Sequence, residues 1–524
     1  MSDPRRESSS SPASPAPRGG KANGRASDRD LAGERPIDPE RAARRRSRVD
    51  ESTRVPVLTF FTGGVFWLLA GSILAMLASI KLHTPEFLDG ASWLTFGRVR
   101  PAHLNTMIYG WASPTGIGVI LWLTARLAKA ELRFPRLLVA AAAIWNVAVL
   151  WGTIGILRGE GTSIEWIEFP PYIPPLLVFA FSIVALSVAT TFHDRGEAHV
   201  YVSQWYIFGA IFWFPWLYTV VELLMVYRPM AGSPQASVNW WFAHNVLGLW
   251  LTPIGLASIY YLIPKVLGRP VHSYYLSIVG FWSLALFYNW AGAHHLIGGP
   301  VPAWLVTVSI VASMMMLIPV GTVAINHHFT MVGRFAILKY SPTLRFIVFG
   351  AMSYTAVSMQ GSFQSLRDWN EVTHFTHYTI AHAHLGVYSF FTMTMFGALY
   401  YIMPRLTGWE WASARLIRVH FWGTAGGMAI YWIGLTWGGV LQGAAMNDPK
   451  VPFLDIVKML IPYLWSRSLA GVLMTTGHAA FATLFTMNML HLGKRRYEPT
   501  LLDDPREYAR LLASPPAWEE VPAS

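Results

Sequence analysis

The chain has 524 residues, of which 53% are hydrophobic and 13% are charged. Soluble proteins carry about 25% charged residues, so the composition excludes an ordinary soluble enzyme. The formal net charge is +11, and the absence of cysteine excludes a disulfide framework, a thiolate metal site and a covalently attached c-type heme.

Residues 1–54 differ from the rest of the chain. They are rich in Ser, Pro, Gly and Arg and almost free of aromatic residues. Such a segment cannot bury a core, which predicts a disordered basic tail. It lacks the short apolar core and cleavage site of a signal peptide. The run Arg44-Arg45-Arg46 favours a topology signal that also contacts anionic lipid over a nucleic-acid site.

The segment 55–493 is dominated by apolar stretches of about 20 residues, the length that crosses a membrane as a helix. Twelve such stretches with short connections predict an all-α polytopic membrane domain, followed by a tail at 494–524. The stretches lie at 57–80, 102–126, 137–157, 172–192, 203–227, 238–264, 273–296, 302–326, 343–365, 376–403, 419–442 and 467–491.

The distribution of positive charge predicts the topology. A basic N-terminal tail is expected in the cytoplasm, and an even number of spans places the C-terminus there too. The loops expected on that side are richer in Lys and Arg than the opposite loops. Their positive residues are Lys129, Arg133, Arg136, Lys265, Arg269, Arg334, Lys339, Arg405, Arg415, Arg418 and Lys494-Arg495-Arg496.

The tetrapeptide Ala381-His382-Ala383-His384 lies inside an apolar stretch. Successive helical residues turn by about 100°, so His382 and His384 project from nearly opposite faces. One helix can then hold a metal group on each side. Ionisable residues within a membrane are costly, and such positions indicate a functional site.

Six histidines are expected at one depth, in the outer third of the membrane. Four lie early in even-numbered spans and two lie late in an odd-numbered span. Their agreement favours a shared site over scattered polar core residues, whereas His272, His327, His328 and His374 at helix ends are interpreted as ordinary satisfied polar residues. The six are His103, His244, His294, His295, His382 and His384.

Three of these histidines can form a metal site. His294 and His295 are adjacent, so both can reach a metal on one side of their helix. His244, from the preceding span, would complete a three-nitrogen site with an open position. Neutral imidazole suits copper and iron.

These residues resemble subunit I of the heme–copper oxidase superfamily. The resemblance rests on the histidine pair 50 residues after His244 and on the His-x-His of the tenth span. It covers about residues 57–490 and implies the twelve-helix fold of that subunit.

The C-type branch, the cbb₃-type cytochrome c oxidases, is the most similar. A- and B-type oxidases have a His-Pro-x-Val-Tyr run, whereas this chain has His244-Asn-Val-Leu-Gly. Nitric oxide reductases have glutamates near this histidine, and none follows here before the span ends. The C-type branch has its special tyrosine six residues before the histidine pair, where Tyr288 stands. Similar stretches include Tyr260-Tyr-x-x-Pro-Lys, Arg269-Pro-Val and Leu276-Ser-Ile-Val-x-Phe-Trp.

The resemblance implies two b-type hemes. His103 and His384 would be the axial ligands of a low-spin heme b, and His382 the proximal ligand of a high-spin heme b₃. Two histidines fill both axial positions of one iron and leave it an electron carrier, while a single histidine leaves the other iron open to oxygen.

The resemblance also implies a copper ion, copper B, bound by His244, His294 and His295. Tyr288 would be cross-linked to His244 and would supply an electron and a proton for cleavage of the O–O bond. The plain alternative for Tyr288 is an aromatic residue at the membrane interface.

Further residues are assigned by the same resemblance. Glu168 would help to bind calcium near the heme propionates, although an acidic loop residue is often only solvated. Arg98, Arg100 and His374 are candidates for propionate contacts. Glu222, an acid inside a span, has no partner that the sequence identifies.

Protons must reach the outer site from the cytoplasm. Polar residues deeper in the sixth and seventh spans resemble the single proton pathway of this branch, although Ser and Thr also serve helix packing. They are Thr252, Tyr260, Tyr261, Tyr275 and Ser277.

The expected function is that of an enzyme, a terminal oxidase of the bacterial cytoplasmic membrane. It would reduce O₂ to water and translocate protons, with electrons from c-type cytochrome subunits. One alternative is a nitric oxide reductase-like enzyme with non-heme iron in place of copper, which the missing glutamate and Tyr288 disfavour. Another is a heme-bearing transporter or assembly protein without catalysis, which would not need a third metal.

Overall fold

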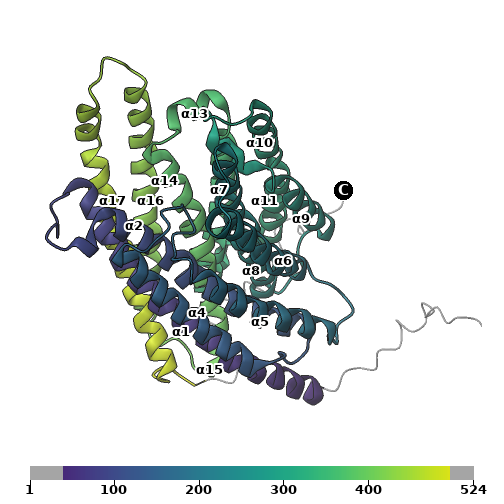
Figure 1. Cartoon of the computed structure of the whole chain (residues 1–524). Coiled ribbons are helices and arrows are strands. Elements are labelled where there is room, and N and C mark those ends of the chain that lie inside the picture. The colour runs from purple at the N-terminus through teal and green to yellow at the C-terminus, as the bar shows by residue number, and fades with distance from the viewer. Residues whose placement is uncertain (1–38, 496–524) are drawn as a thin grey trace, which may run out of the picture. The chain divides into compact units, whose positions relative to one another are not determined.

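The structure is a computed structural model that describes residues 39–495 (Figure 1). Two units are distinguished, residues 1–45 and residues 46–524. In the first unit, the described residues 39–45 are helical. Helix α1 begins at Pro39, inside the segment for which disorder is predicted. Most of both predicted tails lies outside the described residues, and the features below belong to the second unit.

Helices make up the regular structure of the described residues, which confirms the all-α expectation. Short connections join most of them, as expected. In chain order they are α1 (Pro39–His83), α2 (Phe96–Asn105), α3 (Ser113–Ala128), α4 (Pro135–Arg158), α5 (Pro174–His193), α6 (Val202–Glu222), α7 (Ser233–Asn245), α8 (Thr252–Leu267), α9 (Tyr274–Tyr288), α10 (Ala303–Met315), α11 (Leu317–Met331), α12 (Pro342–Gln364), α13 (Arg367–Thr373), α14 (His377–His384), α15 (Met393–Thr407), α16 (Ala414–Met446) and α17 (Phe453–Met489).

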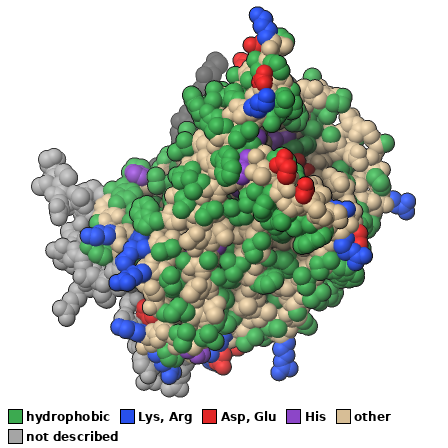
Figure 2. Space-filling model, turned by 90° about the vertical axis from the view of Figure 1, so that its left-hand side faces the viewer, with side chains coloured by type: hydrophobic (Ala, Val, Ile, Leu, Met, Phe, Trp, Pro, Cys, Tyr) green, Lys and Arg blue, Asp and Glu red, His purple; other side chains and the backbone are tan. Residues whose placement is uncertain are grey.

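Eight helical runs in the described part of the chain are long and apolar enough to cross a membrane. The chain is therefore a multi-pass membrane protein. Figure 2 agrees, since apolar side chains cover much of the face it draws. The eight runs are Arg45–His83, Pro135–Arg158, Pro174–His193, Val202–Tyr227, Ser233–Leu267, Ala303–Met331, His377–Thr407 and Phe453–Met489.

Two of these runs form the centre of the second unit. In Ser233–Leu267, 83% of the most apolar stretch is buried, and in His377–Thr407 the value is 89%, against 50% or less in the other six. Helices that face lipid on one side cannot reach such values. The central runs carry His244, His382 and His384, so three of the six histidines lie on the most enclosed helices.

Three helical runs contain a π-helical segment that begins within three residues after a site histidine. Segment η3 (Thr106–Ala112) joins α2 to α3, η5 (Val246–Leu251) joins α7 to α8, and η8 (Leu385–Thr392) joins α14 to α15. These turns follow His103, His244 and His384. π-Turns are rare and frequently occur at functional sites, although a fourth, η4 (Leu223–Tyr227), follows no histidine. Pro114 and Pro253 lie just after η3 and η5, where the missing N–H and the ring disturb the α-helical pattern.

Candidate functional site

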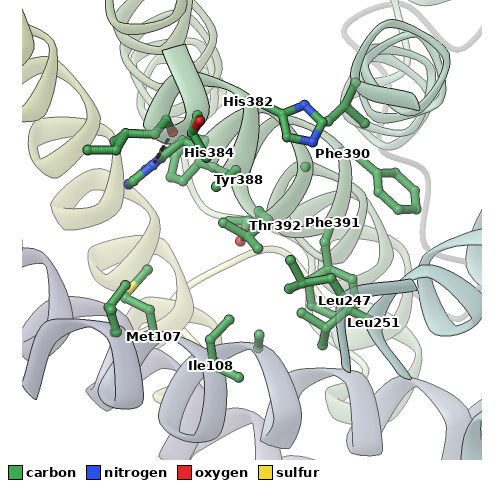
Figure 3. Close-up of a pocket in the computed structure, with 18 of the residues that line it drawn as sticks. Met107, Ile108, Leu247, Leu251, His382, His384, Tyr388, Phe390, Phe391 and Thr392 are labelled. Carbon is green, nitrogen blue, oxygen red and sulfur yellow. Dashed lines mark hydrogen bonds between the residues drawn. The ribbon is translucent and has the colours of Figure 1, made fainter. Parts of the chain in front are cut away.

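A cavity of about 390 Å³ lies among the central helices. This volume is within the range of small-molecule and cofactor sites, roughly 300–1,000 Å³. Figure 3 shows Met107 and Ile108 on one side of the hollow and Leu247 and Leu251 on another, with the helix that carries His382 opposite. All six predicted histidines line this cavity, so the structure brings the whole set together.

His244, His294 and His295 form a compact group. Their ligand nitrogens lie within 4.8 Å of one another, and no other group of three or more His or acidic side chains in residues 39–495 converges in this way. The ring centroids are 5.1 Å apart for His244 and His294, and 4.4 Å apart for His294 and His295. Three imidazoles at the wall of a cavity fit a copper or iron ion with an open position.

The protonation of His294 is set by two serines of α10. Ser313 Oγ donates its single hydrogen to the Ser309 carbonyl at 2.8 Å. It must therefore accept from His294 Nδ1, which lies 2.9 Å away. The proton on Nδ1 leaves Nε2 bare, as a metal ligand requires. Ser309 Oγ also accepts from the His294 backbone N–H at 2.8 Å, which holds the 3₁₀ segment η6 (Ala291–Leu296) against α10.

Hydrogen bonds to backbone carbonyls fix the tautomer of His103 and His384 as well. His103 Nδ1 lies 3.0 Å from the Gly71 carbonyl, and His384 Nδ1 lies 2.9 Å from the Ile380 carbonyl. A carbonyl can only accept, so both rings carry their proton on Nδ1 and leave Nε2 without a proton. Both rings line one cavity with the nitrogen that binds metal available, so together they would hold one heme.

His382 and His384 leave their helix in opposite directions, as Figure 3 shows. The buried Nδ1 of His382 has no hydrogen-bond partner among the described residues. Its ring lies against Gly361 of α12, where an added Cβ would be 2.9 Å from the ring Cε1. Glycine at this position permits the ring to pack this closely on α12, and an imidazole without a partner at the cavity wall fits a heme held by one histidine.

Tyr288, at the C-terminal end of α9, stacks on His244. The ring centroids are 4.4 Å apart and the planes are inclined by 28°. Gly248 permits this approach, because a Cβ there would lie 1.8 Å from Tyr288 Cε1. Tyr288 thus contacts the three-histidine group directly, at the edge of the cavity.

The two predicted arginines lie differently. Arg100 lines the cavity and pairs with Glu165 at 3.0 Å. Arg98 does not line the cavity and donates to the Leu157 carbonyl at 3.3 Å instead. His374 lies against the backbone of His295 and stacks on Phe375 at 3.8 Å. Arg100 and His374 are therefore near the site, and Arg98 holds the end of α4.

Glu168 is buried in the loop between α4 and α5. One carboxylate oxygen accepts from Asn105 Nδ2 at 2.8 Å, which ties the loop to the end of α2. Burial raises the pKa of Glu168 to about 7. It belongs to no converging group of three acidic or His side chains in the described residues. No sequence motif marks Asn105, because its role depends on where this loop lies.

The predicted proton-path residues do not all meet. Thr252 lines the cavity, and Tyr260 and Ser277 are buried. Tyr261 meets Trp122 edge-on at 5.7 Å. The Tyr275 side chain is 82% exposed on the outside of the helical bundle, so the structure separates it from the others.

Two residues of α11 join Tyr260 and Ser277. Asn326 Nδ2 donates to Ser277 Oγ at 2.8 Å, and the His327 ring lies 4.6 Å from that of Tyr260. The buried Nε2 of His327 has no partner among the described residues, and the interpretation of His327 as an ordinary polar residue stays a prediction. His327 stands at the end of a predicted span, where a side chain is usually exposed, so its burial was not predicted.

Two further cavity residues, Arg467 and Tyr431, were not predicted from the sequence. Both line the cavity beside His384, with Arg467 over the Tyr431 ring at 5.8 Å and the Tyr431 hydroxyl 3.3 Å from His384 Nε2. A guanidinium at the wall of a largely apolar cavity suits an anionic group such as a carboxylate. Arg467 stands at the start of the predicted span 467–491, and this charged position was the signal in the sequence that could have indicated it.

Residues 55–473 match the family described as Cytochrome C and Quinol oxidase polypeptide I. The chain belongs to this family, which confirms the resemblance to subunit I of heme–copper oxidases. It is an oxidoreductase subunit of the terminal oxidase class, and the family works as one subunit of a membrane complex with heme and copper. The described fold and the histidine-lined cavity agree with this class.

Relatives match over most of their length. The cbb3-type cytochrome c oxidase subunit CcoN1 of Stutzerimonas stutzeri is 30% identical, over 80% of this chain and 91% of the relative. A cytochrome c oxidase subunit 1 of Rhodobacter capsulatus is 31% identical, over 79% and 81%. A solved heme-copper terminal oxidase dimer shares the fold, with a TM-score of 0.62, 17% identity and coverage of 87% and 86%.

Proposed function

We propose that the chain is the catalytic subunit of a cbb₃-type terminal oxidase of the bacterial cytoplasmic membrane. It would reduce O₂ to water and translocate protons, with electrons from membrane-anchored c-type cytochrome subunits. The observation that carries this proposal is the contact of Tyr288 with His244 inside a three-histidine group that shares a cavity with His382.

The residues present fit two hemes and one copper ion. His103 and His384 would hold a low-spin heme b, and His382 a high-spin heme b₃. His244, His294 and His295 would hold copper B. When bound, these groups supply electron transfer and the site at which oxygen is reduced.

The chain's own part is to orient ligands and to supply a proton. The Gly71, Ile380 and Ser313 contacts hold three imidazoles with Nε2 unprotonated. The Tyr288 hydroxyl carries a proton at the edge of the three-histidine group. Thr252 lies at the cavity wall and begins α8, which also carries the buried Tyr260, and this course of α8 supports a proton path on this side.

The C-type branch is supported by two features together. Tyr288 lies on α9, and η5 after His244 consists of Val246–Leu251 without an acidic residue. An iron site of the nitric oxide reductase kind would need a carboxylate beside His244. A non-catalytic heme protein would need no converging group of three histidines.

Twelve membrane crossings are supported by helical runs at the remaining expected stretches. The stretch 102–126 falls within the run from α2 to α3, and 343–365 coincides with α12 apart from its last residue. The stretch 273–296 contains α9, and 419–442 lies within α16. We propose that both termini are cytoplasmic, on the side of the loops rich in Lys and Arg.

The first experiment is the heme and metal content of the purified complex, with a CO-difference spectrum. Two b hemes per chain, one of them binding CO, and one copper are expected. Non-heme iron in place of copper would move the assignment to nitric oxide reduction. A single heme that does not bind CO would leave only an electron carrier.

Tyr288→Phe tests the redox role within the same preparation. The substitution removes the phenolic hydroxyl and keeps the ring on His244, so both hemes and copper should remain. Oxygen reduction should fall by at least about 100-fold, because the proton donor is lost. Full turnover of this variant, measured with an oxygen electrode, would refute the role of Tyr288.

A further inference from the structure

Positive side chains gather at the helix ends remote from the six histidines. Helices α3, α8 and α15 each continue a run that carries a site histidine near its start, and each has a basic residue in its last turn. In Figure 1, α15 lies at the opposite end of the bundle from α13. The three residues follow their histidines by about one membrane crossing. They are Arg126, Lys265 and Arg405.

Asp50 of α1 is the acid among these charges. Arg126 Nη1 lies 3.3 Å from Asp50 Oδ1, and the two side chains are only 20% and 24% exposed. The charge of Arg405 also acts on the Asp50 carboxylate, as do those of Arg54 and Arg46 from α1 itself. Four positive side chains from three helices therefore lie around one half-buried carboxylate.

Lys265 adds a fourth helix to this group. Arg126, Arg405 and Arg46 repel its ammonium group, so Lys265 lies among the same charges. Like charges at short range repel one another, and Asp50 neutralises only one of them. The whole group is called the basic cluster below. It consists of Arg46, Arg54, Arg126, Lys265 and Arg405 around Asp50.

Aromatic rings support two of the guanidinium groups. Arg405 lies over the Tyr401 ring at 3.5 Å, and Arg126 lies over the Trp122 ring at 5.3 Å. Tyr261 contacts both rings, with centroids 5.7 Å from that of Trp122 and 6.3 Å from that of Tyr401. Cation–π contacts hold a guanidinium in place. Both arginines are therefore positioned in advance, which lowers the entropic cost of binding a ligand.

Helix ends explain only part of the basic cluster. The C-terminal end of a helix carries partial negative charge and stabilises a cation there, which accounts for one basic residue each on α3, α8 and α15. Arg46 and Arg54 lie far from the C-terminal end of α1 at His83, and both are exposed. A bias of positive charge toward one side of the membrane does not require these side chains to converge. Their excess charge fits an anion.

Exposed apolar residues of α1 adjoin the basic cluster. Val55 directly follows Arg54 and is 60% exposed, and Phe66 and Ile73 are 58% and 60% exposed. These three lie about three turns and then about two turns apart, so they share one face of α1. A hydrocarbon chain would cover this face inside the membrane. A ligand with an anionic head and an apolar tail therefore fits the two features together.

We propose that the basic cluster binds a phosphate group at the membrane surface, carried by an anionic phospholipid. Arg126 and Arg405 would donate N–H groups to its oxygens, because a guanidinium has five donors and matches phosphate geometry. The exposed Arg54 and Lys265 would add attraction for its charge. The proposal goes beyond the proposed function, and the failure of either leaves the other standing because the hemes and copper take no part.

The test titrates the purified complex, washed free of lipid in a neutral detergent, and follows its melting temperature. Phosphatidylglycerol should raise this temperature in a saturable way, since a ligand of the folded state stabilises it. Phosphatidylcholine, whose headgroup has no net charge, should not. The double variant Arg54→Gln with Lys265→Gln keeps the Asp50–Arg126 pair. Its affinity for phosphatidylglycerol should fall by about 30-fold, as expected for the loss of two charges at the surface.

The matched control is the double variant Arg136→Gln with Arg415→Gln, which removes the same charge from loops expected on the same side. Both residues are exposed, and neither is among the charges that act on Asp50. The control should bind phosphatidylglycerol as the unaltered complex does. Equal weakening in the two double variants would reduce the effect to overall charge and overturn the proposal.

Two further outcomes would also overturn it. No saturable response to phosphatidylglycerol in the unaltered complex would show that the basic cluster holds no lipid. Inorganic phosphate is the probe for a soluble ligand. If it gives the same rise in melting temperature at millimolar concentration and displaces phosphatidylglycerol, the ligand is a soluble phosphate and the assignment to a lipid is wrong.

Discussion

Close approaches at single residues shape the three-histidine group. The Tyr288 ring reaches His244 only because Gly248 has no side chain, since a Cβ there would lie 1.8 Å from the ring. The motif His244-Asn-Val-Leu-Gly therefore has a steric meaning in addition to its resemblance to a family pattern. Spacing along the sequence places Tyr288 near the pair, but the need for glycine opposite it comes from the packing of α9 on η5.

Gly248→Ala is expected to displace Tyr288 and to disturb the metal group. Overpacking of this kind costs about 1–3 kcal/mol or more, and the copper content of the purified complex should fall. Copper analysis and thermal unfolding check the result. Gly426→Ala, where nothing lies within 4 Å of an added Cβ, is the control and should leave both unchanged. Normal copper binding by Gly248→Ala would contradict the packing argument.

Glu168 predicts a pH dependence of stability. Its pKa rises from 4.5 to about 7 because of burial, so the folded state holds the proton more tightly than the unfolded state. The resulting stability is complete below about pH 4.5 and is lost as the pH rises through 7. In the presence of a calcium chelator, Glu168→Gln should remove this loss of stability at high pH. The free energy of unfolding above pH 7 should rise by up to about 3 kcal/mol.

Added calcium shows whether Glu168 is a calcium ligand or only a buried acid. If the carboxylate binds calcium, as the family resemblance implies, added calcium should raise the melting temperature of the unaltered protein but not that of Glu168→Gln. Glu165→Gln is the control, since Glu165 is partly exposed and pairs with Arg100. An equal calcium response in all three proteins would exclude Glu168 as a ligand.

At the scale of elements, the π-turns and the serine contacts of α10 position the histidines. Segments η3, η5 and η8 each follow a site histidine within three residues, so one backbone device recurs on three helical runs. Segment η6 instead depends on a neighbouring helix, because Ser309 and Ser313 bond to it. Neither arrangement is visible in hydropathy, which reports only that these stretches are apolar.

Ser313→Ala tests the support that α10 provides. The substitution removes the acceptor for His294 Nδ1, so the ring loses its fixed tautomer and orientation. Copper affinity should fall by about 10–100-fold, the usual effect of losing such a contact, as measured by competition with a chelator. Ser283→Ala is the control, because Ser283 bonds only to carbonyls of its own helix. Unchanged affinity in Ser313→Ala would show that the contact is dispensable.

For the whole molecule, the absence of cysteine permits a direct test of topology. Glu131 lies in a loop expected in the cytoplasm and Gly299 in a loop expected outside, and both are exposed. In intact cells stripped of their outer membrane, an impermeant maleimide should label Gly299→Cys and not Glu131→Cys. Both should react after lysis. The reverse pattern would invert the proposed orientation of all the spans.

The sequence determines the class of this protein and the residues of its site. Apolar stretches of about 20 residues are a local property, so helix positions follow from composition. The order and spacing of six histidines and Tyr288 identify the family, and all of them line one cavity. The opposite directions of His382 and His384 follow from the turn of a helix and are seen in Figure 3.

Only the tertiary structure decides which side chains meet across helices. It turns Tyr275 outward and Arg98 away from the cavity, although both stand close in sequence to residues that line or approach the site. It joins Asn326 to Ser277 and His478 to both Ser72 and Tyr388. Hydropathy and motif spacing describe each helix alone, whereas these contacts depend on which helix faces which, and that is settled by packing of the whole bundle.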